Sequence, residues 1–152
     1  MKLLKKDRIN EVTLRFPSRS ANEGFARAVV ACFAAQMDPT LNELEDIKTV
    51  VSEAVTNAIV HAYPATVGKV ILKARICPGS VLEITVKDHG KGIPDVEKAR
   101  QPMYTTGGEE RSGMGFTIME SFMDKLTVKS TPGRGTTVVM RKKIATRLKP
   151  QG

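Results

Sequence analysis

Aromatic residues are scarce in this chain of 152 residues, which contains no tryptophan, two tyrosines and five phenylalanines. Single-stranded nucleic acids are bound largely by stacking their bases on such rings, so the composition argues against that class of binder. Long apolar runs are also lacking. None approaches the roughly 20 residues of a membrane span, and residues 1–6 contain no stretch typical of a secretory signal. We therefore expect a cytoplasmic protein without a membrane partner.

Cysteine and histidine are equally rare, with two of each. Cys32 and Cys77 have neither CxxC spacing nor a histidine cluster beside them, which argues against the usual zinc patterns. We expect both to be buried thiols in a reducing compartment, with a disulfide between them as the alternative.

Basic residues outnumber acidic residues, and the net charge is +8. Residues 1–9 contain four basic side chains and one acidic, residues 141–152 contain five basic and none acidic, and residues 10–140 hold fifteen of each. The pattern predicts one domain over residues 10–141 between basic tails at 1–9 and 142–152. Nucleic-acid modules carry their basic stripe on the folded surface, so we expect no direct nucleic-acid partner. The alternative, a basic nucleic-acid binder, would depend on the tails.

Hydrophobic periodicity predicts an α+β fold. Because hairpins join several strands, we expect a two-layer sandwich, a mixed, mostly antiparallel sheet covered on one face by helices. In the first helix Phe25, Cys32 and Phe33 are expected to pack, and Thr40 or Asn42 can cap the second helix. The expected elements are strand 11–16, helix 21–37, helix 41–62, strands 68–76 and 81–87, short helix 94–100, loop 101–112, helix 113–123, and strands 126–130 and 136–141.

Three polar side chains lie on the otherwise apolar part of the long helix expected at residues 41–62. Glu53, Asn57 and His61 are four residues apart, so they lie along one face. A carboxylate and a carboxamide on an otherwise apolar helix are costly to bury without partners. We therefore expect Glu53 and Asn57 to line a site, and a half-exposed polar stripe is the alternative. His61 either touches a ligand or is an ordinary helix-end histidine.

Glycine motifs follow that helix along the chain. Each is weak alone, because glycines after strands are usually turns. Because they follow the helix that carries Glu53 in this order along the chain, they form a specific set. They are Asp88-x-Gly90-x-Gly92 after a strand, Gly113-x-Gly115 at a helix start, and Gly135-Thr136-Thr137 at the start of the last strand.

The chemistry of this set points to a nucleotide. An aspartate at a strand end can accept a hydrogen bond from the exocyclic amine of adenine, and glycines let the backbone approach a flat ring. A glycine-rich helix start presents N–H groups to phosphates. The amide oxygen of Asn57 suits Mg²⁺, which is held by few protein ligands together with phosphates and water. Arg111 can neutralise a terminal phosphate, and Glu53 can orient or deprotonate a nucleophile.

These motifs resemble those of the ATPase superfamily that joins gyrase, the chaperone Hsp90, histidine kinases and MutL. The resemblance is closer to the anti-sigma F factors of spore-forming bacteria, and it covers roughly residues 10–140. Only the short segment 64–67 and the two tails depart from the family pattern. The segments that carry the closer resemblance are Val51-Ser52-Glu53-Ala54-Val55-Thr56-Asn57-Ala58, Ala99-Arg100-Gln101-Pro102 and Glu110-Arg111-Ser112-Gly113-Met114-Gly115-Phe116.

The resemblance implies a homodimeric protein-serine kinase that binds ATP, ADP and Mg²⁺. It also implies two protein partners. One is sigma factor F, whose access to RNA polymerase is blocked, and the other is a small anti-anti-sigma protein that is phosphorylated on a serine. The family fold is a mixed sheet with helices on one face. An anti-sigma kinase of the general stress type, with a different sigma factor, is the closest alternative.

The resemblance also implies roles for single residues. Glu53 and Arg111 match catalytic positions, and Asn57 matches the Mg²⁺ ligand. Glu23 and Arg27 match a first-helix surface for protein partners, although from the spacing alone they are equally an i,i+4 ion pair. Thr105, Thr106 and Arg111 fall in the segment that acts as the ATP lid. The residues expected to contact the nucleotide are Asn57, Asp88, Gly90, Gly92, Thr105, Thr106, Ser112, Gly113, Met114, Gly115 and Thr137.

Two other classes are weighed against a serine kinase. An ATP-dependent protein clamp would bind nucleotide without phosphotransfer, but a clamp has no need of a base such as Glu53. A histidine kinase would carry its phosphoacceptor on a helix pair in a second domain, which we do not expect here. The only histidines, His61 and His89, lie in the ATP-site motifs. The phosphoacceptor is therefore expected to come from another protein.

Overall fold

The computed structural model of the protein describes residues 9–101 and 115–145. Each helix and strand expected from the sequence is found there, with boundaries shifted by a few residues. The turn η2 is a 3₁₀ turn and η3 is a π-helical turn. The elements are β1 (Asn10–Pro17), α1 (Ala21–Ala34), η2 (Ala35–Met37), α2 (Leu41–Thr56), η3 (Asn57–His61), β2 (Lys69–Cys77), β3 (Val81–Asp88), α3 (Val96–Ala99), α4 (Gly115–Phe122), β4 (Lys125–Thr131) and β5 (Gly135–Lys143).

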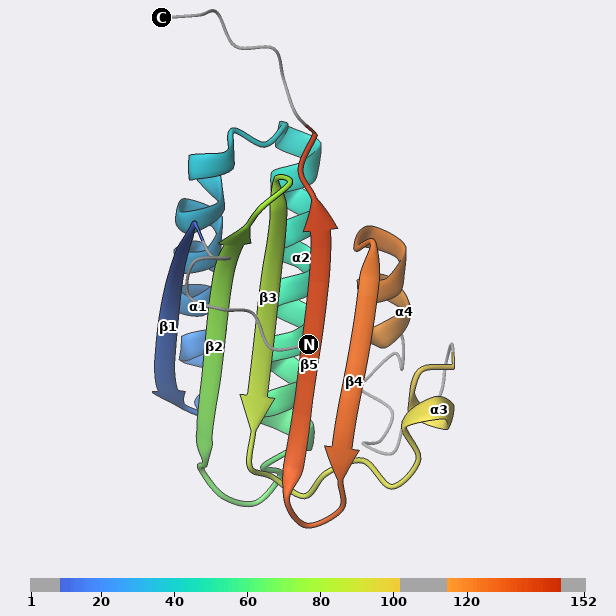
Figure 1. Cartoon of the computed structure of the whole chain (residues 1–152). Helices are drawn as coiled ribbons and strands as arrows, with labels where there is room; N and C mark the ends of the chain where they lie inside the picture. The colour runs from blue at the N-terminus through green and yellow to red at the C-terminus, as the bar shows by residue number, and fades with distance from the viewer. Residues whose placement is uncertain (1–8, 102–114, 146–152) are drawn as a thin grey trace, which may run out of the picture.

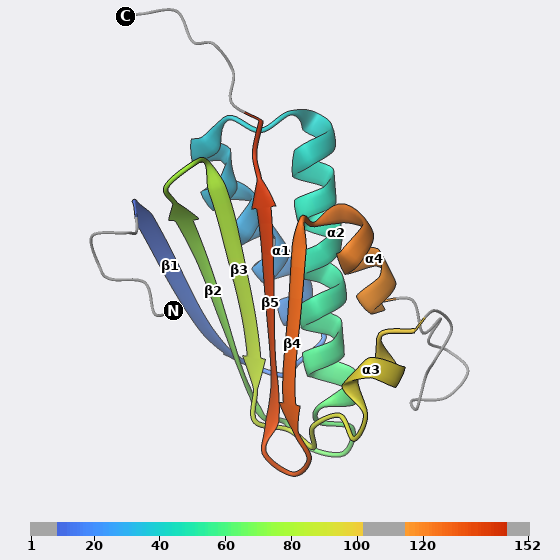
Figure 2. The same cartoon turned by 45° about the vertical axis from the view of Figure 1, so that its right-hand side comes forward.

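The strands form one sheet in the order β1-β2-β3-β5-β4, and each neighbouring pair is antiparallel. Figure 1 looks onto the open face of this sheet, with α1, α2 and α4 behind it. Figure 2 shows the sheet and the helices as two layers. The expected α+β sandwich with helices on one face is therefore confirmed. No parallel pair occurs among the strands that the structure describes.

The hydrophobic core lies between the sheet and α2, which crosses behind β3 (Figure 1). Leu82, Ile84 and Val86 alternate along β3 and are at most 2% exposed. Every second residue of a strand faces the same way, so these three side chains all face the helix layer. The helix contributes the buried residues Ile47, Val50, Val51, Ala54 and Val55. Within residues 9–101 and 115–145, no helix is long and apolar enough to cross a membrane.

Helix α1 packs with a different face from the one expected. Phe25 is 54% exposed and Cys32 is exposed as well, so the expected burial of both was wrong. Small apolar residues of this helix occur on all its sides, so the helical spacing of apolar residues is compatible with more than one buried face. Cys77 is buried as expected, and no disulfide joins it to Cys32. The buried residues of α1 are Ala26, Val30, Phe33 and Ala34.

A capping box begins α2 and also ties down the end of the domain. The Thr40 hydroxyl accepts from the N–H of Glu43 at 3.0 Å, and the N–H of Thr40 donates to Oε1 of Glu43 at 2.8 Å. The second carboxylate oxygen of Glu43 accepts from the N–H of Ala145 at 2.9 Å. Ile144, between β5 and Ala145, is fully buried. The described fold therefore continues past residue 141, where the predicted domain ends, to Ala145.

Candidate functional site

The last turns of α2 carry the polar face expected from the sequence, and Glu53 and Asn57 are both half-buried. The N–H of Asn57 still donates to the carbonyl of Glu53, as in a regular α-helix. The next turn is wider, because the N–H of Ala62 donates to the carbonyl of Asn57 at 3.2 Å, a step of five residues. Such π-helical turns occur frequently at functional sites. The sequence gives no signal for this turn, which ends at the half-buried His61.

Gly115, the first residue of α4, lies directly against the same two side chains. A Cβ atom on Gly115 would be 3.3 Å from Nδ2 of Asn57 and 3.3 Å from Oε2 of Glu53. Figure 2 shows α4 alongside α2. The fold therefore brings Gly115, the last residue of the second glycine motif, to the helix that carries Glu53 and Asn57, and the missing side chain leaves space between them.

Asp88 ends β3 at the same end of the sheet as the last turn of α2 (Figure 1). Its Oδ1 accepts from the N–H of Gly90 at 2.9 Å and from the N–H of Thr136 at 3.2 Å. Asp88 is 6% exposed, and this burial raises the pKa of its carboxyl, although the two N–H donors act in the opposite direction. Because both bonds use Oδ1, Oδ2 can accept a hydrogen bond from a ligand.

Thr136, and not Thr137, is the threonine beside Asp88. The β3–β5 register pairs Asp88 with Thr136, whereas Thr137 is paired with Lys87. Successive residues of a strand point to opposite faces, so Thr137 lies on the open face of the sheet. Thr137, which the family resemblance implies as a nucleotide contact, therefore lies on the face of the sheet opposite to Asp88 and Thr136. The hydroxyl of Thr136 also lies 2.7 Å from Oγ of Ser130 on β4, a residue that no sequence motif indicated.

The glycines of the first motif are required by the packing of the protein itself. A Cβ atom on Gly90 would lie 2.3 Å from the carbonyl oxygen of Ala62. Gly92 has a φ of 76°, and its Cβ atom would lie 2.4 Å from the carbonyl oxygen of Thr131. The loop after Asp88 thus passes between the end of η3 and the turn that joins β4 to β5. The sequence predicts glycines here either for a turn or for the approach of a flat ring, and the contacts with Ala62 and Thr131 add a requirement from the fold itself.

Tyr63 holds this loop from the helix side and was not anticipated. Its hydroxyl accepts from the N–H of His89 at 2.6 Å and donates to the carbonyl of Lys69 at 2.9 Å. The side chain therefore joins the end of the helix, the start of β2 and the residue that follows Asp88. The only hint in the sequence is the place of Tyr63 between the long helix and Pro64.

Several expected site residues lie outside the described residues, within the segment that joins α3 to α4. The elements on either side of this segment are held together, since Nη2 of Arg100 lies 2.7 Å from Oε1 of Glu120 on α4. The expected residues outside the described part are Thr105, Thr106, Arg111, Ser112, Gly113 and Met114.

Glu23 and Arg27 form the i,i+4 ion pair that their spacing predicts, with Nη1 of Arg27 3.0 Å from Oε1 of Glu23. The same oxygen of Glu23 accepts a hydrogen bond from the hydroxyl of Ser52 on α2. Ser52 immediately precedes Glu53, so the ion pair links the surface of α1 to the helix that carries the site. The side chain of Arg27 remains 41% exposed.

Asn57 fits a magnesium ion as one ligand among several. In the part of the chain that the structure describes, no group of three or more His, Cys, Asp and Glu side chains could hold a metal. Oδ1 of Asn57 borders the space at Gly115, 3.6 Å from the position of a Cβ atom there. The residues therefore suit an ion whose other ligands are phosphate and water oxygens, as is usual for Mg²⁺.

Comparison with known proteins shows the family to which the chain belongs. A family model described as a histidine kinase-like ATPase domain matches residues 16–142. The anti-sigma F factor of Geobacillus kaustophilus (strain HTA426) is 56% identical over 137 residues, which are 90% of this chain and 94% of that protein. The anti-sigma F factor of Thermoanaerobacter sp. (strain X514) is 58% identical over 136 residues, 89% of this chain and 94% of that protein.

Solved structures of low identity share the fold. The RsbU and RsbW domains of Rv1364c from Mycobacterium tuberculosis align with a TM-score of 0.67 at 16% identity, over 91% of this chain and 33% of that chain. Full-length ShkA in complex with AMPPNP aligns with a TM-score of 0.59 at 20% identity, over 86% of this chain and 31% of that chain. The family model spans most of the chain, and the relatives are more than half identical over nearly their whole length. The chain therefore belongs to the histidine kinase-like ATPase family and, within it, to the anti-sigma F factors.

Proposed function

We propose that the protein binds ATP and ADP, with Mg²⁺, where α2, α4 and the end of β3 meet. Oδ2 of Asp88 would accept a hydrogen bond from the exocyclic amine of adenine. The N-terminal end of α4 at Gly115 would face the phosphates. Asn57 would supply the protein ligand to Mg²⁺, and the ion would neutralise phosphate charge. The name of the matched ATPase family and the AMPPNP bound to ShkA both support a nucleotide as the ligand.

We further propose that the protein is a protein-serine kinase. Glu53 would take the proton of a serine hydroxyl while that oxygen forms a bond to the γ-phosphorus and the bond from phosphorus to ADP breaks. Arg111, outside the described residues, would neutralise charge on the transferred phosphoryl group. Thr105 and Thr106 would belong to the lid over the nucleotide.

One observation carries this proposal, the close approach of Gly115 to Glu53 and Asn57, where a Cβ atom on the glycine would lie 3.3 Å from each of the two side chains. It joins a candidate base, a candidate metal ligand and a helix N-terminus in one place. Phosphoryl transfer depends mainly on positioning and on neutralising charge, and these are the groups that it needs. A protein clamp that only binds ATP would not need the carboxylate of Glu53.

The protein partners are proposed from the family. The protein would bind sigma factor F in the cytoplasm of a spore-forming cell and keep it from RNA polymerase. A small anti-anti-sigma protein would present the serine that is phosphorylated. The α1 surface at Glu23 and Arg27 would contact a partner, and the protein would act as a homodimer. The name shared by relatives at 56% and 58% identity supports the sigma factor as a partner.

Transfer of radiolabel from the γ-position of ATP to a serine-bearing anti-anti-sigma protein tests the kinase proposal. Glu53→Gln should keep ATP binding and lose transfer, because the amide cannot act as a base. Glu45→Gln, on the same helix but 68% exposed at its side chain, is the matched control and should transfer label normally. If wild type with saturating Mg-ATP leaves the substrate protein unlabelled, the kinase proposal is wrong and an ATP-dependent clamp is favoured.

A pull-down from native cell extract, run with Mg-ATP and again with Mg-ADP, tests the partners. We expect a sigma factor with one nucleotide and a small serine-bearing regulator with the other. Mass spectrometry of the recovered sigma factor separates sigma factor F from a general stress sigma factor. Identical proteins with both nucleotides would contradict a nucleotide-controlled exchange of partners.

A further inference from the structure

The open face of the sheet, on the side away from the helices, is strongly basic. The register shows which side chains share this face. It holds nine cations and two carboxylates, a net charge of +7, whereas the other described residues hold eight cations and eleven carboxylates, a net charge of −3. The cations of the open face are Arg15, Lys69, Lys73, Arg75, Lys87, Lys125, Lys129, Arg141 and Lys143.

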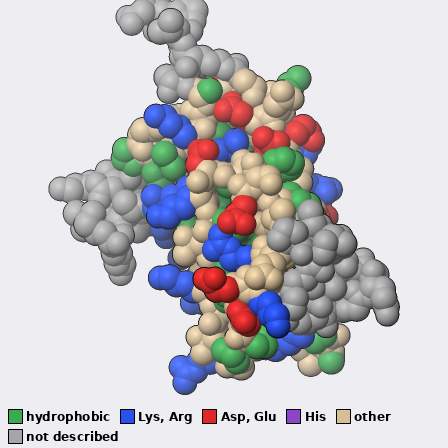
Figure 3. Space-filling model, turned by 90° about the vertical axis from the view of Figure 1, so that its right-hand side faces the viewer, with side chains coloured by type: hydrophobic (Ala, Val, Ile, Leu, Met, Phe, Trp, Pro, Cys, Tyr) green, Lys and Arg blue, Asp and Glu red, His purple; other side chains and the backbone are tan. Residues whose placement is uncertain are grey.

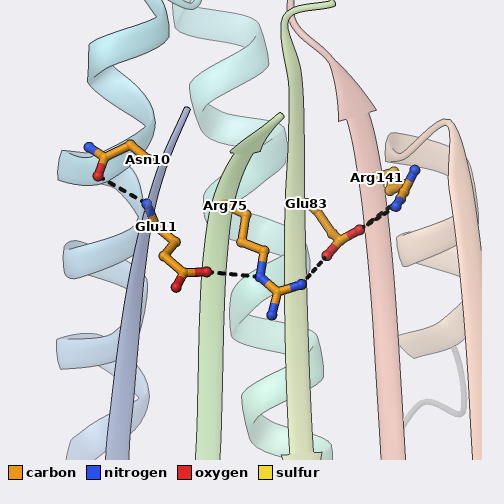
Figure 4. A network of polar contacts seen from close by, with 5 residues as sticks. All are labelled: Asn10, Glu11, Arg75, Glu83 and Arg141. Carbon is orange, nitrogen blue, oxygen red and sulfur yellow. Dashed lines mark hydrogen bonds and ion pairs between the residues drawn. The ribbon is translucent and has the colours of Figure 1, made fainter. Parts of the chain in front are cut away.

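The two carboxylates of the open face are already neutralised by arginines. Figure 4 shows the ladder across four strands, in which Glu11 pairs with Arg75 at 3.2 Å and Glu83 lies between Arg75 and Arg141. Glu83 is 3.3 Å from Arg75 and 2.6 Å from Arg141. Within residues 9–101 and 115–145, the seven other cations of the face have no hydrogen bond or ion pair from their side chains.

These seven unpaired cations are spread over the width of the sheet. Arg15 on β1, Lys87 on β3 and Lys129 on β4 belong to one row across the strands, and successive members are two strands apart. Because neighbouring strands lie about 4.8 Å apart, these three charges are spaced by roughly 10 Å. Figure 3 views the β4 edge, with the open face along its left-hand margin, where blue side chains gather. Although the net charge over residues 10–140 is balanced, the positive and negative charges are therefore unevenly distributed over the surface of the protein.

We propose that this open face binds the phosphate backbone of a double-stranded nucleic acid without reading its sequence. Lysine, arginine and threonine are the side chains that usually contact phosphates, and Thr13, Thr85, Thr127 and Thr137 lie between the cations. The expectation of no nucleic-acid partner rested on the neutral sum of the folded part, and the sorting of charges to one face removes that reason.

The composition of the face favours a nucleic-acid duplex over other polyanions. Protein interfaces have apolar, aromatic-rich centres that are poor in lysine, whereas this face has no aromatic side chain and its central apolar residues are Ile71 and Val139. The lack of aromatic rings also removes the stacking platform that single strands require. A duplex, whose bases are already stacked, needs only the phosphate contacts.

The test is fluorescence anisotropy of a labelled duplex of about 20 base pairs with the full-length protein, between about 50 and 200 mM salt. The face variant Lys73→Gln, Lys87→Gln, Lys129→Gln removes three unpaired charges. It should weaken binding at least about tenfold at low salt and reduce the salt slope by about 3. Wild type should bind the duplex more tightly than a single strand of the same length.

Two triple variants with the same change in charge serve as controls. Arg19→Gln, Lys48→Gln, Lys98→Gln alters cations outside the open face, and Lys5→Gln, Lys6→Gln, Lys149→Gln alters the tails. We expect both to retain more of the duplex affinity than the face variant does. The proposal is overturned if a control weakens binding as much as the face variant, if wild type does not bind the duplex at about 50 mM salt, or if polyglutamate or phosphatidylserine vesicles bind more tightly than the duplex. ATP binding by the face variant should be unchanged, so this test is independent of the proposed kinase activity.

Discussion

Gly115 and Asn57 meet where α4 begins and α2 ends, and a Cβ atom on Gly115 would lie 3.3 Å from Nδ2 of Asn57. The contact requires α2 to stay helical as far as Asn57 and the first residue of α4 to be a glycine, which has no side chain. A phosphate bound at the N-terminus of α4 would therefore lie next to the candidate metal ligand. Nucleotide affinity should thus respond to small changes at Gly115.

Gly115→Ala should weaken Mg-ATP binding about tenfold, which corresponds to about 1.4 kcal/mol. The added methyl group would crowd Asn57 and Glu53 in the proposed phosphate site. The free energy of unfolding should not fall, because those two side chains can move and alanine favours a helix over glycine by about 1 kcal/mol. Calorimetric titration and urea unfolding measure the two effects. Gly24→Ala on α1, where the new Cβ atom would make an ordinary contact 3.7 Å from Arg27, should leave ATP binding unchanged. Wild-type affinity in Gly115→Ala would contradict the proposed site.

Asp88→Asn should separate stability from ligand binding. Burial raises the pKa of Asp88, so the folded protein favours the protonated form and is penalised by the ionised carboxylate at pH 7. Asparagine keeps an oxygen for the N–H groups of Gly90 and Thr136 but carries no charge. The free energy of unfolding should therefore rise at pH 7, while ATP affinity falls at least about tenfold because a hydrogen bond to a charged acceptor is lost.

The pH dependence provides the control for this variant. The stability advantage of Asp88→Asn should shrink as the pH falls, because the wild-type carboxyl becomes protonated. The cost of burying its ionised form then disappears at about pH 4. Urea unfolding of both proteins at several pH values measures this difference. A constant difference between the two proteins from pH 7 to about pH 4 would contradict a buried, ionised Asp88.

Thr136→Ala and Thr137→Ala should differ in their effect on ATP binding. Thr136 shares the face of Asp88 and its hydroxyl contacts Ser130, whereas Thr137 lies on the opposite face. We expect the Thr136 hydroxyl to contact the nucleotide beside Asp88, and the loss of one such contact typically costs about 1 kcal/mol, so Thr136→Ala should weaken ATP binding about fivefold. Thr137→Ala should leave the dissociation constant of Mg-ATP within about twofold of wild type. The opposite order of the two variants in calorimetric titration would place the nucleotide on the open face.

Glu43→Ala should lower the free energy of unfolding by about 1 kcal/mol at pH 7, because it removes half of the capping box and the bond to Ala145. Burial opposes ionisation of this carboxylate, but the N–H groups of Ala145 and Thr40 hold the pKa of Glu43 below its usual value. A lowered pKa stabilises the fold above the unfolded-state pKa, and this contribution is lost as the pH falls through the folded-state value. The difference from wild type in urea unfolding should therefore shrink in acid.

Glu45→Ala is the control for this prediction. Glu45 lies on the same helix, its side chain is 68% exposed, and it forms a surface ion pair with Lys48 at 3.3 Å. Such pairs contribute between about 0 and 1 kcal/mol. Equal destabilisation by the two substitutions would show that the bonds of Glu43 are not what stabilises the fold.

Local patterns predicted most elements of the fold. Alternation in Leu82, Ile84 and Val86 correctly predicts a strand with one buried face. Thr40 caps α2 as one of the two expected residues. The buried side of α1 could not be predicted, because small apolar residues lie on all sides of the helix and only packing against α2, β1 and β2 selects one of them.

The site was predictable as a set of motifs but not as a geometry. The order of Glu53, Asp88 and Gly115 along the chain indicated a helix, a strand end and a helix start, which the fold places at one end of the sheet. The choice between Thr136 and Thr137 depends on the β3–β5 register, which pairs residues 48 positions apart. A shift of one residue reverses the face of a strand, and no local pattern fixes such a long-range register. The basic open face was hidden for the same reason.

Calorimetric titration of the full-length protein with Mg-ATP, and in parallel with Mg-GTP, tests the central claim most directly. Asp88 can accept a hydrogen bond from the amino group of adenine, whereas guanine presents a carbonyl oxygen at that position. We predict one site per chain for Mg-ATP and at least about tenfold weaker binding of Mg-GTP, since a missing partner for a buried charged acceptor costs about 1.5 kcal/mol or more. No heat with Mg-ATP, or equal affinity for the two nucleotides, would contradict a nucleotide site organised by Asp88, Asn57 and Gly115.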